Sequence, residues 1–195
     1  MNTMQNRQWG MMAGLMLAMA ATRFNHFGSS VALPDASLAV FFLGGLYLAK
    51  FHKSLWIFAA LLAEAALIDY YAIGLQGASD WCVTPAYGFL GVAYAVMWFA
   101  GRWIAPHHTL GKTSLMTVIA TATLSSAAAF VISNASFFLF SGRYAEMSAA
   151  EYTSRVAQYF GSYVFVALLY VACAVAAQII YTLLKDKAQR DSHAA

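Results

Sequence analysis

Six apolar runs recur along the chain, with short polar links between them. The runs cover residues 9–21, 36–49, 55–74, 85–100, 115–140 and 156–184. Several reach or exceed the ~20 residues that an α-helix needs to cross a bilayer. None alternates apolar and polar residues as the strands of a membrane β-barrel do. The pattern predicts an all-α integral membrane protein in which residues 1–195 form a single domain of six transmembrane helices.

Composition supports a membrane protein. Of the 195 residues, 62% are hydrophobic and 10% are charged, whereas about a quarter of the residues of a soluble domain are charged. The net charge of +3 comes from basic residues scattered between the apolar runs, so it does not indicate nucleic-acid binding.

The distribution of basic residues predicts the orientation. Six spans place both termini on one side, and eight of the eleven Lys and Arg residues then fall on the side of the termini. The three on the other side are Arg23, Arg143 and Arg155. Because basic residues concentrate in cytoplasmic links, we expect cytoplasmic N- and C-termini. Links 23–35, 76–84 and 141–151 then face outward.

The first run allows two interpretations. Arg7 before it and the Ala18-Met19-Ala20 sequence near its end resemble a signal peptide. We favour a retained helix, because Gly10, Gly14 and Ala18 recur every fourth residue and form a small-residue stripe that lets another helix approach closely. The stripe serves either packing within the protein or docking of a partner membrane protein.

Motifs of common enzyme classes are absent from the sequence. It contains no Walker A motif, so the chain does not hydrolyse ATP on a P-loop by itself, and no His-Glu-x-x-His, Cys-x-x-Cys or Gly-x-Ser-x-Gly. A haem protein is disfavoured, since haem in a helical bundle needs His or Met ligands within the spans and no His lies in mid-span.

Residues 67–87 form the main candidate site, where the third run ends and the fourth begins. Asp69 lies near the outer end of a span, where a carboxylate is costly and usually faces a cavity or a partner. Tyr71, Trp81 and Tyr87 lie close to it in sequence. Each is also a residue type typical of the membrane interface. Asp69 therefore forms either a structural hydrogen bond or the polar wall of a pocket.

Cys82 is the most informative residue of this stretch. Cys173 is expected mid-membrane in the last helix, too far away for a disulfide, so Cys82 is predicted to be a free thiol in an outer loop. A thiolate is a soft metal ligand. A protein-only zinc site needs three or four ligands, and no others cluster here. A single thiolate suits a metal that arrives with most of its coordination filled, as in a macrocycle.

Further polar residues are candidates for the same outer cavity. His26 is either a second ligand or a solvated loop residue. Tyr159 and Tyr163 share one helix face, and Asn134 lies in the fifth run. Glu64 has no evident partner in mid-span, so a protonated, paired or coupling role is open.

Taken together, the six short spans, the small-residue stripe and the Asp-Trp-Cys-Val-Thr-Pro-Ala-Tyr sequence at 80–87 resemble a known family. They are similar to the substrate-binding S-components of energy-coupling factor (ECF) vitamin transporters, and in particular to BtuM-type cobalamin transporters of Gram-negative bacteria. The resemblance covers essentially the whole chain. It implies an S-component-like bundle in the bacterial cytoplasmic membrane with a cobalamin site facing the periplasm.

The same resemblance implies roles for individual residues. Cys82 matches the axial ligand of cobalt, and Asp69 and Tyr87 match polar positions near the corrin. We expect thiolate ligation to promote loss of cyanide from cyanocobalamin. Gly10, Gly14 and Ala18 stand where S-components carry an Ala-xxx-Ala motif that docks an ECF module, although two glycines replace alanines here. The alternatives are an S-component for a flavin or thiamin with a structural cysteine, and a membrane subunit without a ligand.

Overall fold

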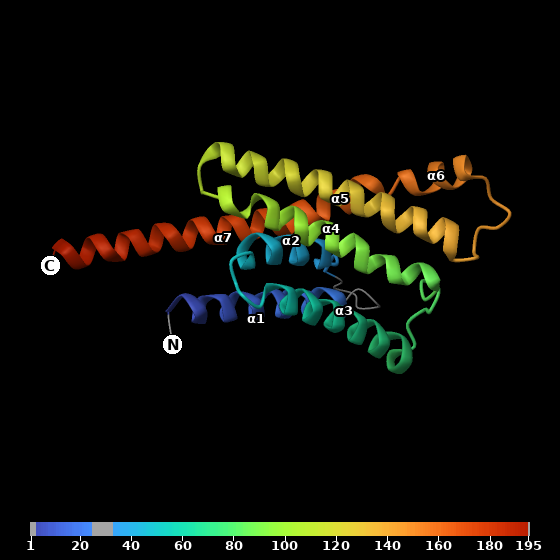
Figure 1. Ribbon diagram of the computed structural model, residues 1–195, viewed down its shortest axis with the longest axis horizontal. Coiled ribbons are helices and arrows are strands. Elements are labelled where there is room, and N and C mark those ends of the chain that lie inside the picture. Colours follow the sequence, from blue (N-terminus) through green and yellow to red (C-terminus); the bar gives the residue numbers. More distant parts are fainter. Residues whose placement is uncertain (1–2, 25–32, 195) are drawn as a thin grey trace.

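A computed structural model describes residues 3–24 and 33–194, and this part of the chain is entirely helical, without a strand. Its α-helices are α1 (Thr3–Phe24), α2 (Ser37–Leu48), α3 (Ser54–Gln76), α4 (Phe89–Ile104), α5 (Lys112–Phe140), α6 (Ala149–Ala157) and α7 (Phe160–Ala194). The 3-10 helix η2 (Pro85–Gly88) leads into α4, and η3 (Ala105–His107) follows it. The helices run roughly along one axis (Figure 1).

Four of the described helical segments are long and apolar enough to cross a membrane: Ser54–Gln76, Pro85–His107, Lys112–Phe140 and Phe160–Ser192. The chain therefore has the character of a helical membrane protein. The other two predicted spans correspond to α1, whose first turns are polar, and to α2, which is apolar but only 12 residues long. At 1.5 Å per residue, α2 extends about 18 Å, well short of a bilayer's hydrocarbon core.

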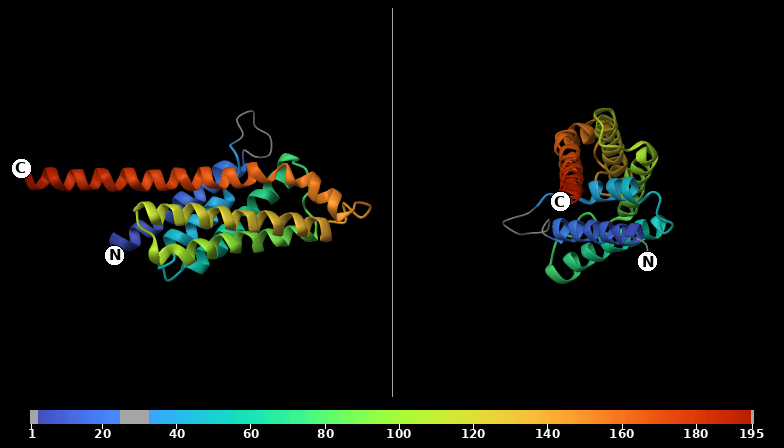
Figure 2. Two further views of the ribbon diagram at one scale, coloured as in Figure 1. Left: turned by 90° about the horizontal axis from the view of Figure 1, so that it is seen from above. Right: turned by 90° about the vertical axis from the view of Figure 1, so that its left-hand side faces the viewer.

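The short helix α2 is the most buried element of the bundle. Only Leu38 and Tyr47 of its residues are not buried. Viewed along the bundle, α2 lies at the centre, between α1 and α3 on one side and α5 and α7 on the other (Figure 2). A helix that is apolar on every face is expected at the centre of a bundle, because none of its faces meets a polar environment.

Glycines bring α2 and α4 into close contact. A Cβ atom on Gly45 would collide with the Trp98 carbonyl of α4, and one on Gly101 would collide with the Phe42 carbonyl of α2. The absence of side chains at these positions lets the two backbones approach closely, as small residues do in membrane helix pairs. The Trp98 side chain is fully buried beside this crossing.

Both termini lie at one end of the bundle, with the links 49–53 and 108–111 (Figure 1). The links 77–84 and 141–148 lie at the opposite end, which we call the loop end. At the loop end, α1 and α2 stop short of α3, α4 and α5 (Figure 1).

The last apolar run differs from the prediction. Residues 141–151 were expected to be a link and 156–184 one helix. Instead, the separate helix α6 begins at Ala149, with Ser148 as its N-cap, whose hydroxyl accepts a hydrogen bond from the Glu151 amide. The long helix α7 begins only at Phe160 and continues to Ala194, ten residues beyond the predicted end. A short amphipathic helix next to an apolar run is difficult to separate from it by hydrophobicity alone.

Candidate functional site

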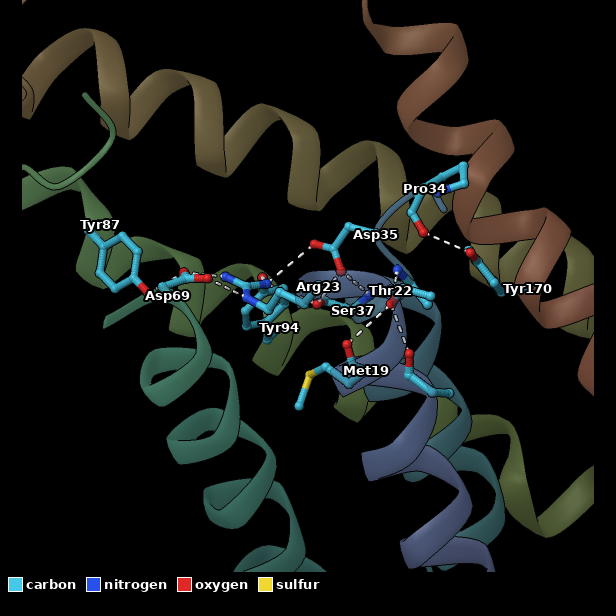
Figure 3. Close-up of polar contacts among 12 residues, drawn as sticks. Met19, Thr22, Arg23, Pro34, Asp35, Ser37, Asp69, Tyr87, Tyr94 and Tyr170 are labelled. Atoms are coloured by element: carbon cyan, nitrogen blue, oxygen red, sulfur yellow. Dashed lines mark hydrogen bonds and ion pairs between the residues drawn. The ribbon is translucent and has the colours of Figure 1, made fainter. Parts of the chain in front are cut away.

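An arginine at the end of α1 is the centre of the candidate site. Arg23 lies in the last turn of α1 and is only 6% exposed. Its Nε and Nη2 donate hydrogen bonds of 2.7 and 2.5 Å to the two carboxylate oxygens of Asp69, which is 5% exposed on α3 (Figure 3). Such a bidentate ion pair neutralises both charges and fixes the relative orientation of the two side chains. Asp69 is thus ion-paired to an arginine of a neighbouring helix.

The third nitrogen of the same guanidinium points toward α2 and α4. Nη1 of Arg23 donates to Tyr94 Oη at 2.9 Å, to Ser37 Oγ at 3.0 Å and to Asp35 Oδ2 at 3.3 Å. The Tyr94 ring is held by stacking on Phe41, with centroids 4.4 Å apart. Arg23 therefore connects the ends of α1 and α2 to α3 and α4 through one buried group.

Tyr87 completes the shell around Asp69. Its hydroxyl donates a 2.6 Å hydrogen bond to Asp69 Oδ2 (Figure 3). Tyr87 reaches this position because Pro85 opens the 3-10 turn η2, where its missing N–H costs little, and the Tyr87 amide bonds the Thr84 carbonyl at 2.8 Å. Asp69 is thereby fully hydrogen-bonded, as a buried carboxylate needs to be.

The chain before α2 is fixed by contacts with α1 and α7. The Thr22 hydroxyl accepts from the Ala36 amide at 3.1 Å. The Tyr170 hydroxyl of α7 donates to the Pro34 carbonyl at 2.7 Å (Figure 3). Asp35 Oδ1 accepts from both the amide and the hydroxyl of Ser37, at 2.9 and 2.6 Å. These bonds hold Asp35 at the start of α2, where a carboxylate also satisfies free N–H groups.

A cavity of about 480 Å³ adjoins this network. Its volume falls within the ~300–1,000 Å³ typical of small-molecule sites. The walls come from α1 to α5, α7 and the 77–84 link. The lining residues are Arg23, Pro34, Asp35, Leu38, Asp69, Ile73, Ser79, Cys82, Val83, Tyr87, Leu90, Tyr94, Ser133, Tyr159, Ser162, Tyr163 and Val166.

Cys82 lies in the loop beside this cavity. Helix α3 ends at Gly77, whose φ of +70° is the left-handed conformation that terminates many helices. Two turns follow, in which the Val83 amide bonds the Asp80 carbonyl at 2.8 Å and the Thr84 amide bonds the Cys82 carbonyl at 3.0 Å. Both Cys82 and Cys173 are free and exposed, as the sequence predicted for Cys82. The thiol therefore borders the cavity with no disulfide to restrict it.

The cavity brings together five residues singled out in the sequence: Asp69, Cys82, Tyr87, Tyr159 and Tyr163. Asp69, Cys82 and Tyr87 belong to the stretch 67–87, and Tyr159 and Tyr163 come from a distant segment at the start of α7. The cavity also contains a buried cation, Arg23, beside Asp69.

Other predicted site residues lie elsewhere. Trp81 lines a second cavity of about 500 Å³ at the loop end, where the Arg143 guanidinium stands 4.3 Å from the Trp81 ring centre. Tyr71 is 43% exposed on α3 and does not line the cavity. The Asn134 amide donates to the Phe130 carbonyl one turn earlier in α5. Asn134 does not line the cavity, whereas the adjacent Ser133 does. His26 lies outside the described residues.

The predicted docking stripe is on the surface of α1. Gly10 and Gly14 are exposed, and nothing stands within 4 Å of a Cβ atom built on either one. Ala18 is half-buried. Among the described residues, these glycines do not pack against another helix.

Arg23, Asp35, Ser37 and Tyr94 were missed as site residues in the sequence. Arg23 was assigned to an outer link, because it ends the first apolar run. A usable signal was Asp69 itself: a carboxylate within an apolar run requires a cation, and Arg23 is the basic residue that ends the first run on the same side of the bundle.

No family model matches this chain, and no curated protein matches its sequence. Within residues 3–24 and 33–194, no group of three or more His, Cys, Asp or Glu side chains is arranged to hold a metal ion. The cavity offers one exposed thiol, an ion pair, several hydroxyls and apolar walls.

Proposed function

We propose that this protein binds a corrinoid at the loop end and takes part in its uptake across a bacterial cytoplasmic membrane. The observation that supports the proposal most directly is the position of Cys82, a free thiol on the wall of a cavity that also contains Asp69 and Tyr87. These are the three residues that match the BtuM-type pattern.

The chemistry of a corrinoid fits a single cysteine. The corrin ring fills four equatorial positions of cobalt and leaves two axial positions, and a thiolate is a soft ligand suited to one of them. A complete corrinoid exceeds a drug-sized ligand, so the 480 Å³ cavity would hold the region around one face of the ring while the remainder extends toward the loop end.

Thiolate ligation also provides a reaction for cyanocobalamin. The Cys82 thiol would lose its proton to solvent, its sulfur would form a bond to cobalt, the cobalt–cyanide bond would break, and cyanide would leave as an anion with its electron pair. Cobalt keeps its oxidation state, so no oxidant or reductant is required. The protein would thus act primarily as a transporter, with loss of cyanide as a consequence of binding.

In the membrane, we propose six spans with cytoplasmic termini and a cavity facing the periplasm. The placement of both termini at one end and the Cys82 loop at the other agrees with this topology. Gly10, Gly14 and Ala18 would dock an ECF module that supplies ATP hydrolysis, and the exposure of both glycines supports that role.

The test is an absorption spectrum of detergent-purified protein from cells supplied with cyanocobalamin. Wild type and the Cys173→Ala control are expected to carry a corrinoid whose spectrum differs from free cyanocobalamin. Cys82→Ala is expected to lose that difference, because it removes the thiol that lines the cavity. Cys173→Ala is the control because Cys173, the other free cysteine, lies in α7 outside the cavity lining. A colourless wild type that also fails to bind added cyanocobalamin would refute the proposal, and a co-purified flavin or thiamin would replace it.

A further inference from the structure

The cavity has an excess of negative charge. Among the described lining residues, the formal charges belong to Arg23, Asp69 and Asp35. Arg23 donates two short hydrogen bonds to Asp69, at 2.7 and 2.5 Å, but only one, of 3.3 Å, to Asp35. The arginine charge is therefore matched mainly by Asp69, and the unmatched carboxylate is Asp35.

Asp35 is also the most exposed of the three charged side chains that line the cavity. Its side chain is 31% exposed, while those of Arg23 and Asp69 are each 8% exposed. Oδ1 of Asp35 is occupied by the amide and hydroxyl of Ser37. Oδ2 has only the long contact with Arg23, and an ionised carboxylate oxygen can accept further hydrogen bonds.

The other polar lining groups do not select strongly for the sign of a ligand. They are the hydroxyls of serine and tyrosine and the Cys82 thiol, and a hydroxyl both donates and accepts. Among the lining side chains, Asp35 is therefore the main group that can distinguish ligands by their charge.

We propose that Asp35 Oδ2 accepts an N–H bond from the ligand, so that the cavity selects corrinoids whose side chains end in amides and rejects those whose side chains end in carboxylates. This inference rests on the proposed corrinoid function and specifies the class of corrinoid. An amide supplies a neutral N–H donor to the carboxylate. A ligand carboxylate at the same place supplies no donor and adds a like charge, and such repulsion is a common source of specificity.

The test compares two probes with the same ring system, dicyanocobinamide, which has amide side chains, and dicyanocobyrinic acid, which has carboxylates. Binding to purified wild-type protein is measured by spectral titration at pH 7.5. We expect cobyrinic acid to bind at least about 100-fold more weakly than cobinamide, since an apposed like charge is strongly unfavourable in a partly desolvated site.

Asp35→Asn is expected to reduce this preference at least tenfold. An asparagine keeps an oxygen for the two Ser37 donors and is itself favourable at a helix start, so the fold should persist. Thermal unfolding of the variant checks that it does. Asp80→Asn is the matched control, because it removes the same charge from the exposed 77–84 link, outside the cavity lining. Its preference should equal that of wild type.

The outcomes are distinguishable. If wild type binds neither probe, the corrinoid function itself fails. If it binds both probes equally, that function stands and the selectivity is refuted. If wild type prefers cobinamide but Asp35→Asn keeps the full preference, or Asp80→Asn loses it equally, then Asp35 is not the selecting group and the inference is overturned.

Discussion

Replacing Asp69 by asparagine tests the claim that a buried ion pair holds the site together. The substitution preserves the shape of the side chain but removes its charge and places an NH2 group where a carboxylate oxygen accepted N–H bonds. Arg23, 6% exposed, would keep its hydrogen bonds to the Tyr94 and Ser37 hydroxyls, but its ionic contacts would be reduced to the 3.3 Å contact with the carboxylate of Asp35. A charge left without its partner in the interior is strongly unfavourable.

The magnitude follows from the geometry. Removing one partner of a buried pair typically costs about 3–5 kcal/mol, and the nearby Asp35 places this case toward about 3 kcal/mol. For a chain of this size, that corresponds to a fall in Tm of roughly 6–12 °C. Tyr87→Phe should cost less, about 1.5 kcal/mol, because it removes a single bond to Asp69 and leaves the ion pair in place.

The assay is thermal unfolding of the detergent-purified variants, with Asp80→Asn as an exposed carboxylate control that should shift Tm by less than about 2 °C. A double variant, Arg23→Gln with Asp69→Asn, is the sharper measurement. It should be less destabilised than the sum of the two single variants, since it leaves neither of the two charges unpaired. Additive losses, or an unchanged Tm for Asp69→Asn, would refute the coupling of these two charges.

Two further predictions concern the packing and the loop end. Gly45→Ala should cost about 1–3 kcal/mol in the same assay, because its methyl group collides with the backbone of α4. The control Gly74→Ala, with open space around it in α3, should be neutral or stabilising. Equal tolerance of both substitutions would contradict the close α2–α4 contact. Arg143→Ala removes a cation–π contact with Trp81 that is worth about 0.5–1 kcal/mol. Amide hydrogen exchange in residues 77–84 should therefore accelerate about two- to fivefold. Unchanged exchange would show that this contact does not restrain the loop.

Much of the helical architecture follows from hydrophobicity. The run 55–74 became α3, Ser54–Gln76, and the run 115–140 became α5, Lys112–Phe140. Apolar side chains in uninterrupted series form helices in a membrane because the backbone must satisfy its own hydrogen bonds there. The ends also had local signals, Pro85 before α4 and Gly77 after α3, each of which has a conformational preference that limits a helix.

The boundaries that were missed depend on contacts between distant segments. Tyr152 of α6 is 5% exposed and packs against Phe138 and Tyr144. Hydrophobicity along the chain does not reveal that one aromatic residue in an otherwise polar stretch lies against the end of another helix. For this reason the prediction placed residues 149–151 of α6 in a link and residues 156–157 in the last span.

The candidate site was predictable where a residue's chemistry is unusual for its position, as for Asp69 in a span and Cys82 in a polar loop. Arg23 was harder, because an arginine after an apolar run usually marks the membrane surface. Its burial depends on which carboxylate lies opposite, and that is a property of helix packing that one segment does not contain.

The length of α2 explains how a buried arginine and a ligand-sized cavity occur together. A 12-residue helix extends about 18 Å, whereas α3 and α5 have 23 and 29 residues. The end of α1 meets the start of α2 beside the cavity, which places Arg23 and Asp35 together in its lining. Residues of the longer helices and of the Cys82 loop complete the lining. The short apolar run 36–49, which by length alone is a poor membrane span, is therefore the feature of the sequence that produces the site.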